Sequence, residues 1–349
     1  MLEASLGPAQ QHHHLSVFPI LAEESGELPY LLMAHAMATG VLTIQEVGDG
    51  QVPLLQAQNR ALDPILILDG EQLVGAKQNR MTNRSIILPP ESVTQIPVSC
   101  MEHGRWHFDG DEFAPAPQHA PSRVRRKARE TEARSAKRAR DAEALGHRAP
   151  SSYRDLADAQ GEVWSEILEV SENLGSRSET GALDSVYEDR RSEMERWLEA
   201  FPCQPRQVGL LAFLGPKPLG MDALGAPFQY QSLHRRILTG YVLDALDARS
   251  LDASAQKPER NRGTPVQHSK AEEFVEMMRN APRTPSESVG SGEYRILDGP
   301  VLGGELVENG HLVHLSAFPS LDGSVQSGGA PGDAAGTPIA RPSHRRRIF

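Results

Sequence analysis

The densest group of functional side chains lies in Leu68–Ser85, with the sequence LDGEQLVGAKQNRMTNRS. Lys77 and Arg80 are suited to hold a phosphate or a carboxylate, and Arg80 can do so through two parallel N–H bonds. Glycines let a ligand approach the backbone closely, and amide side chains supply both donors and acceptors. We therefore predict an anion-binding site in this stretch. Its candidate residues are Asp69, Gly70, Glu71, Gly75, Lys77, Gln78, Asn79 and Arg80.

Two other interpretations of this stretch stay open. Asp69 or Glu71 could act as the general base of a hydrolase or transferase, because a positioned carboxylate can accept a proton in the transition state. Alternatively, the stretch is a surface hairpin whose charges pair with one another, since Asp-Gly between apolar runs is a hairpin signal. A carboxylate in a deep pocket would favour the enzyme, and an exposed hairpin would count against it.

A second polar group lies in Pro97–Phe108. Cys100, His103 and His107 have the spacing C-x2-H-x3-H, which could supply three metal ligands or a thiol with a histidine base. A structural zinc site needs a fourth ligand, and a cysteine at a strand end is most often a small buried apolar residue, so we predict no metal. Three further residues of this stretch extend the anion site if their strand runs beside Leu68–Ser85. They are Glu102, Arg105 and Trp106.

The signatures of several common enzyme classes are missing. The sequence has no GxGxxG, Walker A loop, HExxH, GxSxG or CxxC pair. Dinucleotide-binding, P-loop, zincin and hydrolase classes therefore have no motif support, and no cofactor is indicated.

The elements that must position these residues are mostly strands. Apolar runs separated by Gly, Pro, Asn and Asp predict strands from 15 to 100, around 207–215 and from 294 to 318, with one early helix over Tyr30–Thr39. ILDGEQLVG at 67–75 resembles ILDGPVLGG at 296–304, and HLSVFP at 14–19 resembles HLSAFP at 314–319. We predict an α+β fold in which N- and C-terminal strands close a strand-rich core, sandwich-like or a mixed sheet, with a helical layer or insertion.

Helical periodicity marks the segments Tyr153–Asn173, Asp184–Ala200 and Phe228–Ala248, and Ser269 with Glu272 forms a possible capping box for one more helix. We expect a flexible N-terminus over 1–13 and a single domain over 14–320. The domain begins with a strand-rich part (14–108), followed by a basic linker or helix (109–150). Helices around a strand pair (151–248), a linker (249–268) and a helix with closing strands (269–320) complete it. A disordered basic tail is expected over 321–349.

Charge is distributed unevenly along the chain. The net charge is -10, but residues 123–148 carry ten Lys or Arg against four acids, and four arginines of the tail add to the positive side. The rest of the chain therefore carries about -20. Segment 123–148 has no apolar face and is expected to be a solvated helix. Because it lacks aromatic residues for base stacking and the body is acidic, nucleic acid is not an expected partner. Assembly through the charged arms is a further possibility, and it would be salt-sensitive.

Composition narrows the class of protein. With 30 Gly and 26 Pro, an all-helical bundle is not expected. No apolar run is long enough to span a membrane, no signal peptide is visible, and Cys100 and Cys203 are too few for a disulfide framework. We expect a cytoplasmic protein without membrane contact.

LILDGEQLVGAKQNR at Leu66–Arg80 and IPVSCMEHGRW at Ile96–Trp106 resemble a bacterial domain family named for its association with ADP-ribosylglycohydrolases and rhodanese-phosphatase proteins. HLSVFP, GEVW at Gly161–Trp164 and GGELVENGHLVHLSAF at Gly303–Phe318 extend the resemblance over about 15–320. The resemblance implies no particular reaction. It implies a role near ADP-ribose, NAD-derived or phosphate-linked signalling.

The leading hypothesis is an accessory protein that binds a small anionic or nucleotide-like ligand, or a protein partner. In this hypothesis Lys77 and Arg80 hold the anion, Gln78 and Asn79 orient it, and the two carboxylates orient the bases or accept a hydroxyl.

Overall fold

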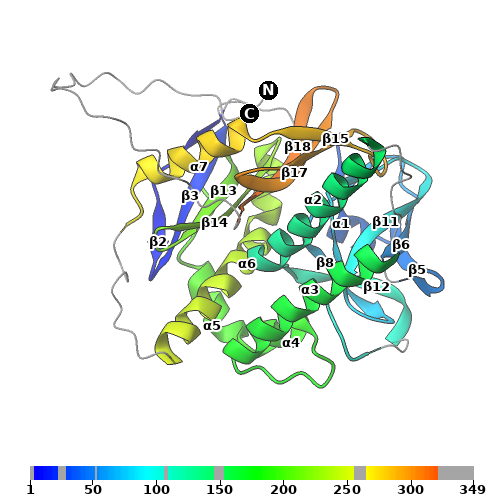
Figure 1. Cartoon of the computed structure of the whole chain (residues 1–349), viewed down its shortest axis with the longest axis horizontal. Helices are drawn as coiled ribbons and strands as arrows, with labels where there is room; N and C mark the ends of the chain where they lie inside the picture. Colours follow the sequence, from blue (N-terminus) through cyan, green and yellow to red (C-terminus); the bar gives the residue numbers. More distant parts are fainter. Residues whose placement is uncertain are drawn as a thin grey trace.

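The computed structural model of the chain describes residues 4–22, 29–51, 53–105, 109–144, 153–254 and 265–320. Within these residues, strands form three sheets and helices cover them (Figure 1). The predicted α+β fold is confirmed, and so is the prediction that N- and C-terminal strands share one sheet.

The largest sheet has nine strands and joins the two ends of the described chain. β3 (Leu15–Ala22) and β18 (His311–Pro319) lie on either side of a hairpin formed by β13 (Gln207–Leu214) and β14 (Lys217–Leu224). Its main order is β1-β3-β13-β14-β18-β17-β16-β15, and β2 also pairs with β3. The remaining strands are β1 (Ala4–Leu6), β2 (Gln10–His12), β15 (Arg283–Ser286), β16 (Glu293–Leu297) and β17 (Val301–Glu308).

A six-stranded sheet curls into a half-barrel, in the order β12-β8-β9-β11-β6-β5, and its two edge strands contact each other. Its interior is apolar, with Ile44, Leu55, Leu73 and Ile96 fully buried. Its strands are β5 (Leu42–Gln51), β6 (Leu54–Asn59), β8 (Glu71–Ala76), β9 (Arg80–Thr82), β11 (Ser92–Cys100) and β12 (Asp109–His119). A small third sheet contains β4 (Leu31–Leu32), β7 (Ile65–Ile67) and β10 (Ile86–Leu88).

Helices cover both faces of the nine-stranded sheet. α7 (His268–Asn280) packs Phe274 and Met278 on one face. On the other face, α6 (Pro227–Ser254) contacts β13 and β14 of the large sheet and β12 of the half-barrel, so it lies between the two sheets (Figure 1). The other helices are α1 (Met33–Ala38), α2 (Ser122–Ala144), α3 (Tyr153–Asn173), α4 (Leu183–Asp189) and α5 (Arg191–Leu198).

The beginning of the chain differs from the expectation of a flexible N-terminus. Residues 4–6 and 10–12 are strands that pair with the two halves of β3. Both strands have only three residues, which is too short to stand out from the sequence pattern, and the edge of β3 supplies their hydrogen-bonding partners.

Two helix predictions are also corrected. The segment 184–200 is not one helix, because α4 and α5 are separate and meet at Arg190. The capping box expected at Ser269 does not form, since α7 begins one residue earlier and Gln267 makes no side-chain cap. The expected linker 249–268 begins as helix, because α6 continues to Ser254.

The basic segment is not a solvated helix along its first half. It forms α2, where Arg125 and Arg129 are 1% and 3% exposed. The last four residues of the segment, 145–148, lie outside the described residues, as do Trp106, His107 and the tail 321–349. Buried acids on other elements compensate these arginines, which a helical periodicity based on apolar residues does not reveal.

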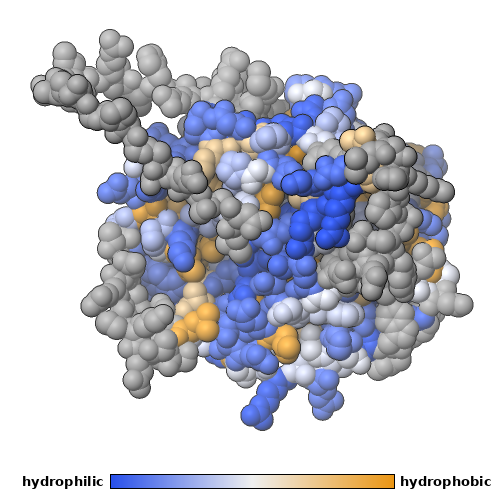
Figure 2. All heavy atoms as spheres, viewed as in Figure 1, coloured by the Kyte–Doolittle hydropathy of each residue, from blue (hydrophilic) through white to orange (hydrophobic). Residues whose placement is uncertain are grey.

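Asp69–Gly70 does not form the expected hairpin turn. It connects β7 to β8, which belong to different sheets, whereas the matching Asp298–Gly299 lies between the antiparallel pair β16 and β17. Within the described part of the chain, no helix is long and apolar enough to cross a membrane. The face of the molecule in Figure 2 is largely hydrophilic, with apolar side chains in small separate groups.

Candidate functional site

The residues of the predicted anion site separate into three places in the fold. Asp69 enters a buried ionic centre, Arg80 lies at one end of the half-barrel, and Glu71 reaches Arg236 on α6. These side chains therefore do not converge on one open cavity.

The buried ionic centre contains Asp69, Asp222, Arg125, Arg129 and His314. Arg125 donates two hydrogen bonds to Asp222, of 2.9 and 2.6 Å, and its Nη2 lies 3.3 Å from Asp69 Oδ2. Arg129 Nη2 lies 2.9 Å from Asp69 Oδ1. Because burial of one unpaired charge costs several kcal/mol, these ions stabilise the fold only as a complete set.

The same contacts fix the protonation of the two carboxylates. Burial alone would raise the pKa of Asp69, yet Arg129 and Arg125 hold it below its ordinary value. Burial likewise opposes ionisation of Asp222, and Arg125 with His314 holds its pKa well below the ordinary value. Ser316 Oγ donates to Asp69 at 2.7 Å and Tyr241 donates to Asp222 at 2.6 Å. Such occupied, weakly basic carboxylates are poor general bases.

Gly70 has a structural task in this centre. Its φ of 87° lies in the left-handed region, and a Cβ there would lie 2.5 Å from His119 Cε1 and 2.6 Å from Arg125 Cδ. Side chains of the protein itself therefore approach Gly70 as closely as a ligand was expected to do.

Ser85, next to the centre, lies in line with His314 and Asp222 in an order that resembles a Ser-His-Asp triad. Ser85 Oγ lies 2.6 Å from His314 Nδ1, and His314 Nε2 lies 3.4 Å from Asp222 Oδ1. All three residues are buried, and Ser85 Oγ also accepts a hydrogen bond from the Asp69 N–H at 3.0 Å. Such chemistry requires that a substrate reach the serine, and Ser85 is buried. The three side chains therefore connect β14, β18 and the segment 83–85 and have a structural role.

Arg80 occupies the second place, one end of the half-barrel, and is fully buried. Its Nη2 pairs with Glu46 at 3.2 Å, and its Nη1 donates to Gln78 Oε1 at 3.0 Å and to Cys100 Sγ at 2.7 Å. Burial raises the pKa of the Cys100 thiol to about 11 despite Arg80, so the thiol stays protonated at neutral pH.

A second polar cluster lies next to Arg80 and consists of Glu102, Arg105 and Asn79. Arg105 Nη2 lies 2.8 Å from Glu102 Oε2, and Arg105 also donates to the Ala76 carbonyl at 2.8 Å and to Asn79 Oδ1 at 3.1 Å. The Asn79 N–H donates to Glu102 at 3.2 Å. Arg105 thus ties the turn of the β8–β9 hairpin to the end of β11.

Lys77 and Gly75 complete this region. The half-buried Lys77 side chain lies over Gly50, and Gly75 has a φ of 122°. His103 packs edge-on against the Trp164 ring. Among the described residues, no three His, Cys, Asp or Glu side chains converge as a metal site would require.

Glu71 belongs to the third place, which is connected to a cavity. Its Oε1 accepts a hydrogen bond from Arg236 Nη1 at 2.8 Å and its Oε2 accepts one from the Leu68 N–H at 2.9 Å. Burial raises the pKa of Glu71, and the attraction of Arg236 offsets part of this effect. Arg236 Nη2 donates to the Ala116 carbonyl at 2.5 Å. These contacts fix the guanidinium group, whose side chain is 13% exposed.

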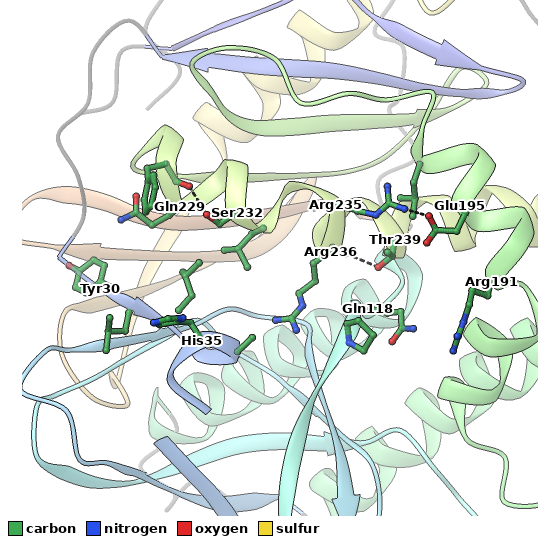
Figure 3. Close-up of a pocket in the computed structure, with 17 residues that line it drawn as sticks. Tyr30, His35, Gln118, Arg191, Glu195, Gln229, Ser232, Arg235, Arg236 and Thr239 are labelled. Carbon is green, nitrogen blue, oxygen red and sulfur yellow. Dashed lines mark hydrogen bonds and ion pairs between the residues drawn. The ribbon is translucent and has the colours of Figure 1, made fainter. Parts of the chain in front are cut away.

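Arg236 lies on the wall of a cavity of about 920 Å³. In Figure 3 its guanidinium group reaches from α6 into the space between His35 and Gln118. The cavity lies between the first half of α6, the segment 30–35, the end of β12 and α5. Its lining comprises Tyr30, Leu31, Leu32, Ala34, His35, Pro117, Gln118, Arg191, Glu195, Leu198, Phe228, Gln229, Ser232, Leu233, Arg235, Arg236 and Thr239.

The cavity wall carries three arginines and one carboxylate, although the protein as a whole is acidic. Arg235 pairs with Glu195 on the wall, whereas Arg191 and Arg236 pair with Glu188 and Glu71, which do not line the cavity. Cavities of 300–1,000 Å³ with apolar walls and a few placed polar groups are typical small-molecule sites. The arrangement can therefore hold a small organic anion.

Sequence reasoning named Glu71 as a candidate but named neither Arg236 nor the other residues that line the cavity. The helical stripe of α6 was interpreted as core, and Arg235–Arg236 stand next to that stripe without a motif. The available signal was a pair of arginines on a half-buried helix, which need either partners or a ligand.

Fold and site together define an α+β protein with a cavity between α5, α6, the segment 30–35 and the end of β12, and with no motif of a known catalytic class. The chain matches ARPP-1, the ARG and Rhodanese-Phosphatase-superfamily-associated Protein domain, over residues 3–318, and it belongs to this family. The resemblance noted from the sequence is thereby confirmed. No curated protein and no solved structure matches the chain.

Proposed function

We propose that the protein is an accessory binding protein that holds a small organic anion in the cavity beside α6, with Arg236 as the anion contact. One observation carries the proposal: a guanidinium group is fixed by the buried Glu71 and points into a cavity of about 920 Å³. A pre-positioned guanidinium loses little side-chain entropy when a carboxylate or phosphate binds.

The bonds of Arg236 to described residues involve one N–H on each terminal nitrogen. A guanidinium group has five N–H donors, so an anion in the cavity has further donors to meet. The ion pair with Glu71 also keeps Arg236 from being an uncompensated buried charge before the ligand arrives.

The family description supports the choice of first ligands. It names association with ADP-ribosylglycohydrolase and rhodanese-phosphatase proteins, whose chemistry involves phosphate esters and nucleotides. ADP-ribose, NAD and nucleoside phosphates are therefore the first ligands to test. The hydrolase alternative has less support, because Glu71 does not line the cavity and Asp69 is held by two arginines.

The test is isothermal titration calorimetry with ADP-ribose, NAD and nucleotides. We expect Arg236→Gln to weaken binding about 10- to 100-fold, since a hydrogen bond to a charged group contributes about 1.5–3 kcal/mol. Arg249→Gln on the same helix is the matched control, because Arg249 pairs with Glu193 and does not line the cavity.

Removal of Arg236 alone leaves Glu71 buried without its partner. The double variant Glu71→Gln/Arg236→Gln removes both charges and keeps the fold testable. Unaltered affinity in a folded Arg236 variant, or no binding of any of these ligands to the wild type, would refute the proposal.

A further inference from the structure

Two aromatic side chains, Tyr30 and Phe228, line the same cavity, and Figure 3 shows Tyr30 on the side of Gln229, the residue that follows Phe228 in the chain. Phe228, in the first turn of α6, is 63% exposed, although large apolar side chains are usually buried. Leu31, Leu32 and Leu233 line the cavity as well.

Tyr30 presents its ring to the cavity while its hydroxyl is occupied elsewhere. The Tyr30 hydroxyl donates a hydrogen bond to Glu308 at the end of β17. Burial and the Glu308 carboxylate raise the pKa of Tyr30, so the phenol keeps its proton and its role as a donor. A ligand in the cavity can therefore contact the ring of Tyr30, while the Tyr30 hydroxyl remains hydrogen-bonded to Glu308.

The charged groups lie at the other part. In Figure 3 Tyr30 and Gln229 lie on one side of Arg236, and Arg191 and Glu195 lie on the other. Arg235 pairs with Glu195 there, so that part is already neutralised locally. Arg236 stands between the two parts, beside His35 and Gln118.

From this arrangement we infer that the cavity selects aromatic anions, in which a planar ring lies near Phe228 and Tyr30 and a joined carboxylate, sulfonate or phosphate group meets Arg236. The inference rests on the proposed function and narrows its class of ligand. Aromatic pairs in offset or edge-to-face geometry gain about 0.5–1.5 kcal/mol beyond the burial of their area. An aliphatic anion of equal charge lacks this contribution.

The test compares two sulfonates that keep a single negative charge over the whole working pH range. Binding of 2-naphthalenesulfonate and of 1-hexanesulfonate is measured by calorimetry on the wild type, Phe228→Ser and Leu168→Ser. Leu168 on α3 is 57% exposed and does not line the cavity, so it is a matched control for loss of a surface apolar side chain.

We expect the aromatic sulfonate to bind the wild type at least fivefold more tightly than the aliphatic one. Phe228→Ser should remove most of this preference, and Leu168→Ser should leave it unchanged. Equal affinities for the two sulfonates, both lost in Arg236→Gln, would overturn the inference and leave the proposed function standing. Binding of neither sulfonate would overturn the inference, while binding of nucleotides in the calorimetry above would still support the proposed function.

Discussion

At the scale of single residues, the side chains with the strongest chemical signature are those most completely paired inside the protein. Asp69 is held by Arg125 and Arg129, and Arg80 is held by Glu46 and Gln78. Sequence patterns show which groups could do chemistry, but partners elsewhere in the chain decide whether those groups face a ligand or each other. Asp69 and Arg125 are 56 residues apart, and Arg80 and Glu46 are 34 residues apart. A high density of functional groups, as in 68–85, therefore indicates a buried polar framework at least as strongly as it indicates a ligand site.

His119 gives a direct test of this framework. It is 1% exposed, and burial, reinforced by Arg125, lowers its pKa to about 3. In the unfolded chain a histidine has a pKa near 6.5. Below about pH 6.5 the unfolded state therefore binds a proton that the folded state does not, and stability falls as the pH is lowered.

We expect the free energy of unfolding of the wild type to fall by up to about 1.4 kcal/mol per pH unit more than that of His119→Gln between pH 6 and pH 4. Urea denaturation at a series of pH values measures this difference. Parallel pH profiles of the two proteins would show that His119 is not buried in its neutral form.

At the scale of elements, the sequence predicted α3 to the residue, α6 apart from its first residue and its last six residues, and strands such as β3, β6, β11 and β13. Apolar residues recur in these elements with the period of a helix or of a strand, so the local pattern is enough to predict them. The expectation of a basic linker or helix over 109–150 was wrong at its start, because residues 109–119 form β12, which pairs with β8. The helix α2 could not be understood in the same way, because Arg125 and Arg129 occupy its buried face beside Val124 and Ala133. Asp222, a lone acid within the apolar strand β14, was the available signal that a buried cation must approach from another element.

Arg125 should therefore be essential to the packing of α2 on the large sheet. We expect Arg125→Met to lower the free energy of unfolding by about 3–5 kcal/mol, since it leaves Asp222 buried without its bidentate partner. Arg126→Met is the matched control, because Arg126 pairs with Glu130 on the partly exposed side of the same helix, and it should cost less than about 1 kcal/mol.

Chemical denaturation of Arg125→Met, Arg126→Met, Asp222→Asn and the double variant Arg125→Met/Asp222→Asn measures these effects. The double variant should lose less stability than the two single changes added together, because each single change leaves a charged partner behind. Full additivity would argue against the coupling of Arg125 and Asp222.

At the scale of the whole molecule, α6 connects the polar framework to the cavity. Its inner face supplies Tyr241 to Asp222, and its outer face supplies Arg235 and Arg236 to the cavity. The chain has a net charge of -10, so its overall field does not favour anions. The group of arginines on the cavity wall is a local arrangement that depends on how α5, α6 and β12 meet.

The cavity beside α6 could not be predicted from the sequence, and the reason is physical. Glu71 and Arg236 are 165 residues apart and become neighbours only because α6 packs across the end of β12. Glu71 could be named as a candidate from the sequence, but its partner Arg236 and the cavity that Arg236 lines could not. Lys77 and Arg105, at the end of the half-barrel, remain the competing positions for an anion.

The most direct test of the central claim is a crystal structure of the protein with 2-naphthalenesulfonate. The account predicts electron density for the sulfonate on the Arg236 guanidinium group and for the rings beside Phe228. Density for the sulfonate on Lys77 or Arg105, with none in the cavity beside α6, would contradict it.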